Sequence, residues 1–141
     1  MAKPSWLFWT IALLALLWNA FGVFDFWMTS TGNEEYLREF DPKMIEWIAA
    51  FPFWRKAMWA TGVFGGLFGA VALILRRRVA VALLIMNFVL MALGFAGHDI
   101  LLAGGAKMYG PSGLAMSALL IAVAAAEWLY ADRAAKQGYL I

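Results

Sequence analysis

Residues 6–28 read WLFWTIALLALLWNAFGVFDFWM, and all but a few of these side chains are apolar. A helix rises ~1.5 Å per residue, so about 20 apolar residues cross the ~30 Å hydrocarbon core of a bilayer. Three further apolar runs follow along the chain. The four predicted spans cover residues 6–28, 55–75, 79–102 and 113–131, with the ends approximate.

The composition agrees with four spans in one domain. Of the 141 residues, 65% are hydrophobic and 14% are charged, and the mean hydropathy is +0.76. A soluble domain of this size exposes too much surface to hide so many apolar side chains. The sequence therefore predicts an all-α integral membrane protein. Residues 1–141 would form a single transmembrane domain, a four-transmembrane-helix bundle with no room for a soluble catalytic module.

The first run is predicted to be a retained span and not a cleaved signal peptide. It continues to Met28, which is longer than the usual apolar core of a signal peptide. Trp18 also stands where a cleavage site would need a small residue.

Basic residues predict the orientation. If four spans alternate, six basic residues share one side of the membrane: Lys3, Arg76, Arg77, Arg78, Arg133 and Lys136. Five lie on the other: Arg38, Lys43, Arg55, Lys56 and Lys107. The triple arginine falls in a very short loop, where the positive-inside bias acts most strongly, so both termini are predicted to be cytoplasmic. The net charge of +2 follows from this topology and indicates no nucleic-acid partner.

The loop between the first two spans predicts an amphipathic interfacial helix. Thr31 and Glu34 have the spacing of a capping box, and Asp41 followed by Pro42 indicates a second helix start. Apolar residues then recur at helical spacing, which favours a helix lying on the outer membrane surface. The pattern favours an aromatic belt, and the alternative is a lid or docking surface. The candidate docking residues are Met44, Trp47, Ile48 and Trp54.

The second span contains the stretch TGVFGGLFGA. Its glycines form two small-xxx-small pairs that lie within an arc of about 100° on the helix. This bare face predicts close packing against another helix. The pattern favours a neighbouring span of the same chain over a second copy of the chain. The residues are Gly62, Gly65, Gly66 and Gly69.

Polar residues inside spans usually face other helices or a cavity. Asp25 lies nineteen residues beyond Trp6, and His98 nineteen beyond Val79, which places both ~28 Å from the cytoplasmic side. We therefore predict that Asp25 and His98 form a hydrogen-bonded pair at the outer end of the bundle. The whole candidate cluster is Asn19, Gly22, Asp25, Asn87, His98 and Asp99.

Three roles remain open for this cluster: a structural polar clasp, which the pattern favours, a proton- or substrate-handling site, and a metal site. Asp99 follows His98 directly and would point about 100° away from it in an α-helix. Asn19 and Asn87 are predicted to donate across helix interfaces. Glu127 is predicted to pair with an arginine among Arg76–Arg78 or with Arg133.

The residue inventory narrows the chemistry. The chain has no cysteine, which excludes disulfides, thiol catalysis and iron–sulfur ligation. Its single histidine excludes a bis-histidine haem within one chain. No nucleophile stands with a base in a catalytic pattern. We therefore predict a protein that is not an enzyme and assign no catalytic residue, metal ligand or cofactor.

The signature W-N-x-x-G-x-x-D-x-x-M-T resembles that of a family of small four-span bacterial inner-membrane proteins. The stretches FPFW, FGG and RRR downstream strengthen the resemblance, which covers roughly the first eighty residues. Some members carry the label "sugar transporter". The resemblance implies the bacterial inner membrane and a four-span fold, and no catalytic residue. The residues that carry the signature are Trp18, Asn19, Gly22, Asp25, Met28 and Thr29.

Two functions are compatible with the sequence. The first is a non-enzymatic accessory or scaffolding subunit, which would pack beside a larger complex in the lipid bilayer and contact other membrane-protein subunits. The alternative is a small transporter or channel, working as a homo-oligomer, in which an inward polar set lines a path: Asn19, Asp25, Asn87 and His98.

Overall fold

The computed structural model describes residues 1–141 as an all-helical chain without strands. Four of its helical elements are α1 (Trp6–Ser30), α2 (Glu34–Leu37), α3 (Pro42–Ala49) and α4 (Phe53–Ile74). They are followed by α5 (Val79–Met91), a π-helix η1 (Ala92–Leu102) that continues α5, and α6 (Gly105–Lys136).

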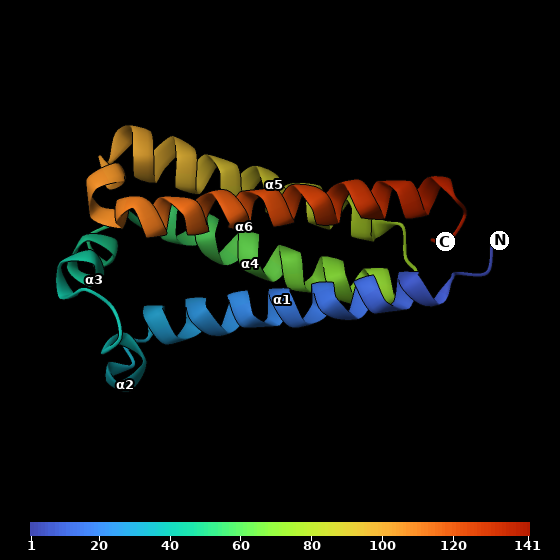
Figure 1. The fold of residues 1–141 in the computed structure, drawn as a ribbon, viewed down its shortest axis with the longest axis horizontal. Coiled ribbons are helices and arrows are strands. Elements are labelled where there is room, and N and C mark those ends of the chain that lie inside the picture. The colour runs from blue at the N-terminus through green and yellow to red at the C-terminus, as the bar shows by residue number, and fades with distance from the viewer.

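Four of these helices are long and apolar enough to cross a membrane: α1, α4, the continuous α5–η1 helix, and α6. They lie roughly parallel in a four-helix bundle with both termini at one end, while α2 and α3 lie at the other end (Figure 1). The predicted fold class is therefore confirmed. We call the end with the termini proximal and the end with α2 and α3 distal.

Side-chain caps explain where the first three helices begin. The Ser5 hydroxyl accepts from the Phe8 backbone N–H at the start of α1, and Asp41 caps α3 by accepting from the Lys43 N–H. The predicted Asp41 cap, with Pro42 in the first turn, is thus confirmed. The predicted Thr31 cap is wrong, because α1 continues to Ser30 and Asn33 caps α2 instead.

The proximal end holds the main apolar core. Phe8 of α1, Leu73 of α4 and Leu84 of α5 are almost completely buried there, together with Leu140 from the C-terminal segment. Arg76 donates from its guanidinium to the backbone carbonyl oxygens of Tyr139 and Ala2. These bonds fasten both terminal segments to the turn between α4 and α5.

The glycines of α4 allow its close approach to α5 and α1. A Cβ at Gly65 would lie 2.5 Å from the methyl group of Met86, and one at Gly69 would lie 2.8 Å from Leu84. A Cβ at Gly66 would overlap the side chain of Asn19. All four glycines of this face are buried, and their neighbours belong to spans of the same chain.

The distal ends of the last two spans depart from regular α-helix. The third span widens into the π-helix η1, in which backbone bonds join residues five apart, as in the bond from the Ala103 N–H to the His98 carbonyl. The last helix begins at Gly105, earlier than predicted, and is broken at Gly110, which has φ 65° and ψ −179°. Proline disfavours helical backbone in the residue before it, and Pro111 follows this break.

Candidate functional site

Asp99 of η1 forms a buried ion pair with Arg55 of α4. The Arg55 Nε donates to Asp99 Oδ1 at 2.9 Å, and the Nη2 donates to Oδ2 at 2.8 Å. Their side chains are 4% and 0% exposed. A two-pronged arginine–carboxylate pair of this kind is geometrically specific, and it fixes α4 against η1.

Two further groups complete the surroundings of Asp99. The His98 Nδ1 lies 2.7 Å from Asp99 Oδ1, and the Tyr109 hydroxyl donates to Oδ2 at 2.7 Å. One carboxylate is therefore shared by three partners from α4, η1 and the first turn of α6. We call this group the distal cluster: Arg55, His98, Asp99 and Tyr109.

Aromatic rings enclose the distal cluster. Phe51 and Trp54 meet the His98 ring edge to face, at centroid distances of 4.9 and 5.0 Å. The Arg55 guanidinium lies 5.6 Å from the ring centres of both Phe51 and Phe95, within reach of a cation–π attraction. Trp47 of α3 packs on Tyr109. The wall keeps water from the ion pair, and weak screening makes such a pair costly to break.

Two of the predicted docking residues belong to this wall. Trp47 is half-buried against Tyr109 and Phe51, and Trp54 packs on His98 while half of its surface stays exposed. Met44 and Ile48 are half-buried on the same face of α3 as Trp47. The apolar face of α3 is thus turned toward the end of the bundle.

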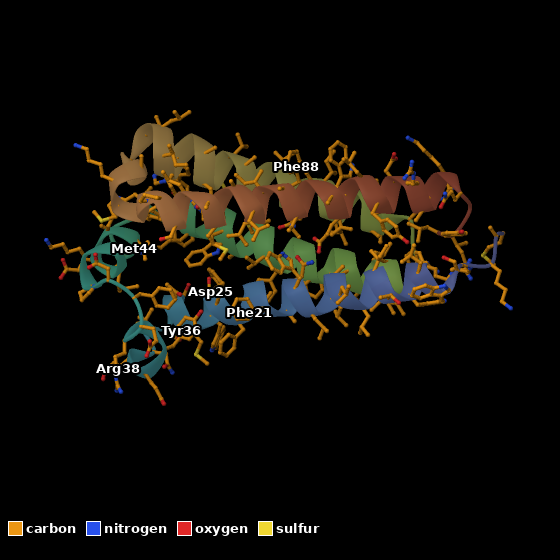
Figure 2. All side chains as sticks on the ribbon, viewed as in Figure 1. Phe21, Asp25, Tyr36, Arg38, Met44 and Phe88 are labelled. Atoms are coloured by element: carbon orange, nitrogen blue, oxygen red, sulfur yellow. The ribbon has the colours of Figure 1, made fainter.

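The predicted pair of Asp25 and His98 is wrong. His98 binds its neighbour Asp99, and Asp25 accepts a hydrogen bond from the Tyr36 hydroxyl of α2. Figure 2 shows Asp25 and Tyr36 together at the distal end of α1. The prediction matches the two residues by depth and leaves the direction of each side chain open. His98 and Asp99 meet although they are adjacent in sequence, in a segment where η1 departs from the α-helical phase of about 100° per residue.

Among the residues of the distal cluster and the Asp25–Tyr36 bond, Tyr36 is the one that lies outside the spans. Loss of solvation raises the pKa of its hydroxyl above the usual value, and the hydrogen bond to Asp25 and the charge of that carboxylate raise the pKa further. Its ring packs edge to face on Phe24 and lies beside Phe40. Tyr36 thus fastens α2 to α1.

A second polar group lies near the middle of the bundle. Asn19 of α1 donates from its amide to both carboxylate oxygens of Glu127 on α6, at 2.9 and 3.1 Å. The predicted arginine partner of Glu127 is therefore wrong, whereas the donation by Asn19 across a helix interface is confirmed. Glu127 forms no ion pair in the chain.

Asn87 of α5 completes this group, which we call the mid-span cluster: Asn19, Asn87 and Glu127. Asn87 faces Asn19 across the bare backbone of Gly66, since an added Cβ there would contact both side chains. Asn87 is 4% exposed, and its Oδ1 has no hydrogen-bond partner, unlike most buried polar atoms. An unsatisfied buried acceptor costs ~1–3 kcal/mol. The Asn87 amide nitrogen, which is the donor of this side chain, makes no hydrogen bond either, so the predicted donation by Asn87 across an interface is absent.

A small cavity of about 40 Å³ adjoins the mid-span cluster. All four spans contribute to its wall, which is mostly apolar. We call it the central cavity. The lining residues are Trp18, Asn19, Gly22, Val63, Asn87, Met91, Leu120 and Ala124.

The structure thus divides the predicted polar set among separate places. Asn19, Gly22 and Asn87 meet at the central cavity, His98 and Asp99 belong to the distal cluster, and Asp25 binds Tyr36. Sequence reasoning missed the roles of Arg55, Tyr109 and Tyr36. One signal was present: Arg55 stands two residues after the start of a long apolar helix, where an arginine needs a partner.

These features define a multi-pass membrane protein built as a four-helix bundle. No group of three or more histidine, cysteine or acidic side chains gathers where a metal ion could be held. Comparison with known protein families, with curated proteins and with solved structures finds no match. The resemblance of the Trp18–Thr29 signature to an inner-membrane family stays a prediction.

Proposed function

We propose that this protein is a non-enzymatic accessory or scaffolding subunit that packs beside another membrane protein through the outer face of α1. The alternation of spans and the basic proximal end support a position in the bacterial inner membrane with cytoplasmic termini. The observation that carries the proposal is the composition of the α1 surface.

The outer face of α1 is rich in aromatic side chains. Six exposed aromatic residues lie on about half of its circumference, interspersed with leucines. Phe21 points away from the bundle in Figure 2 and is 62% exposed. The six are Trp6, Trp9, Trp18, Phe21, Phe24 and Trp27.

The exposed large apolar residues of α5, η1 and α6 differ from this pattern. All of them are aliphatic or methionine side chains, such as Leu93 on η1 and Leu119 on α6. Aliphatic surfaces match lipid tails, whereas aromatic residues are enriched at protein interfaces. The contrast within one bundle favours lipid around α5 and α6, and protein against α1.

Trp18 adds a positional argument. It is the middle residue of α1, twelve residues from each end, and it is 37% exposed. Tryptophan normally concentrates at the two edges of a membrane, where its indole N–H meets water or headgroups. The Trp18 N–H makes no hydrogen bond within the chain. A partner helix on this face could supply the missing acceptor.

The polar interior supports a packing role over a transport role. The distal cluster is closed by aromatic rings, Glu127 is held by Asn19, and the central cavity has a volume of only about 40 Å³. A path through one bundle would need more space than this. The alternative function, an oligomeric transporter or channel, is favoured only by the presence of Glu127 and the cavity inside the spans.

The test places a photo-crosslinking amino acid at Phe21 or Phe24 on α1, in the native membrane. Matched controls carry it at Leu93 and Leu119, on the lipid-facing surfaces. We expect both α1 positions to crosslink to one and the same protein, identified by mass spectrometry, and the controls to crosslink to none. Co-migration of that protein in native mass spectrometry should be lost in the double variant Phe21→Ala/Phe24→Ala.

Three outcomes contradict the proposal. One is a chain that is monomeric after gentle extraction, and another is a chain that crosslinks only to copies of itself. The third is labelling of single cysteines at Gly22 and Met91 by a polar thiol reagent in intact membranes, which would show a wet path and favour transport. The absence of native cysteine makes such labelling specific.

A further inference from the structure

The central cavity combines a small empty volume with an unsatisfied polar atom at the middle of the bundle. Asn87 lines the cavity and is only 4% exposed. Its Oδ1 has no hydrogen-bond partner. Elsewhere in the bundle, the buried Asn19, Arg55 and Asp99 side chains all have partners. Asn87 is therefore the exception that needs an explanation.

The chemistry of the missing partner follows from the atom and the space. A carbonyl oxygen requires a hydrogen-bond donor. The cavity holds about 40 Å³, and one water needs roughly 10–15 Å³ of such space, so about three waters fit and most metabolites do not. The mostly apolar lining offers few competing polar contacts. These features select water as the ligand.

We propose that the central cavity is a binding site for water, in which a bound molecule donates to Asn87 Oδ1. Asn19 lines the same cavity and holds Glu127 through its amide, so the bound water lies one side chain away from the carboxylate. The mid-span cluster is thus a hydrated polar site inside the membrane. This inference does not depend on a partner bound to α1.

The chain is well suited to a direct test because it contains three asparagines, at positions 19, 33 and 87. Protein labelled with ¹⁵N only at asparagine, in lipid nanodiscs or micelles, gives three side-chain amide signals. We expect the Asn87 and Asn19 amides to show nuclear Overhauser effects of the sign that identifies long-lived bound water. Asn33 caps α2 at the exposed distal end and serves as the internal control for contact with bulk water.

A cavity-filling variant tests the location. A Cβ at Gly22 would contact only Val63, at 4.0 Å, so the backbone position has room for the methyl groups of Gly22→Val, which would fill part of the cavity. Gly97→Val is the matched control, since a Cβ there meets nothing within 4 Å and Gly97 does not line the cavity. The bound-water signals at Asn87 should disappear in Gly22→Val and persist in Gly97→Val.

The proposal is overturned if the folded wild-type protein shows no bound-water signal at Asn87. It is also overturned if that signal is unchanged in a folded Gly22→Val variant. Should valine disturb the fold, Gly22→Ala adds a single methyl group and should weaken the signal, while an unchanged signal counts against the site.

Discussion

The amide nitrogen of Asn19 donates to both carboxylate oxygens of Glu127, which joins α1 to α6 at the level of the central cavity. The same amide also donates to the backbone carbonyl of Ala15, at 2.8 Å. One side chain of the first span therefore holds a carboxylate of the last span, and this contact closes the bundle across its middle.

Replacement of Asn19 should weaken this closure. Asn19→Leu removes both bonds to Glu127 and leaves that carboxylate without a partner, so we expect a loss of about 1–2 kcal/mol, the upper range for polar contacts between membrane helices. Unfolding in mixed detergent micelles measures the change. Glu127→Gln keeps an acceptor oxygen and should cost less, and Asn33→Leu provides a control outside the spans. An Asn19→Leu variant as stable as wild type would contradict the prediction.

The distal cluster should be the most sensitive site in the protein. Arg55→Met leaves the buried Asp99 carboxylate without its cation, which typically costs ~3–5 kcal/mol. The neighbouring Lys56 is exposed and donates only to a backbone carbonyl, so Lys56→Met is the matched control. Thermal unfolding measures both. The double variant Arg55→Met/Asp99→Leu should recover part of the loss, because it leaves no buried charge unpaired.

Two glycine-to-alanine changes should have opposite outcomes. At Gly66 the added methyl group would overlap Asn19 and contact Asn87, and such overpacking costs ~1–3 kcal/mol. At Gly22 the methyl group has room and enters the central cavity, so stability should be unchanged or slightly increased. The free energies of unfolding of the two variants are measured in the same detergent mixture and compared. Equal losses at the two sites would show that helix backbone effects outweigh local packing.

The link between α1 and α2 should depend on pH. The folded chain holds the pKa of Tyr36 above its usual value of 10.0, so above pH 10 the unfolded chain loses this proton while the folded chain keeps it. The contribution of Tyr36 to stability is therefore complete below pH 10 and declines as the pH rises further. Tyr36→Phe should be less stable than wild type below pH 10, and the difference should shrink above it.

A difference titration isolates the group responsible. Subtracting the phenolate absorbance of Tyr36→Phe from that of wild type leaves the signal of this tyrosine among the four in the chain. A midpoint at or below pH 10 would contradict the raised pKa. Tyr139→Phe, which changes a tyrosine at the proximal end, is the control.

Length and hydropathy were sufficient to predict the four spans and α3. The apolar runs are long, and Asp41 with Pro42 marks the start of α3 through chemistry that acts within a few residues. The start of α6 was predicted too late because residues 104–113, GGAKMYGPSG, contain four glycines and a proline and look like a turn. In the fold residues 105–109 are helical and carry Tyr109 to Asp99.

Partners within the bundle were harder to predict because they depend on rotation and depth of each helix. The prediction for His98 compared depth at a constant α-helical rise, and η1 departs from α-helical geometry without any proline to mark the change. Glu127 was expected to reach an arginine because the last span was predicted to end at residue 131, yet α6 continues to Lys136 and leaves Glu127 opposite Asn19. The glycine face of α4 was found because small residues at fixed spacing indicate contact regardless of the partner.

The Arg55–Asp99 pair also has an electrical consequence. A membrane potential of 100 mV does work of ~2.3 kcal/mol on each elementary charge that crosses it. Arg55 and Asp99 carry opposite charges whose nitrogen and oxygen atoms lie 2.8 Å apart. Any displacement of the two as a unit therefore transfers no net charge across the field. The Arg55–Asp99 pair can thus stay ionised at the distal end without itself responding to voltage.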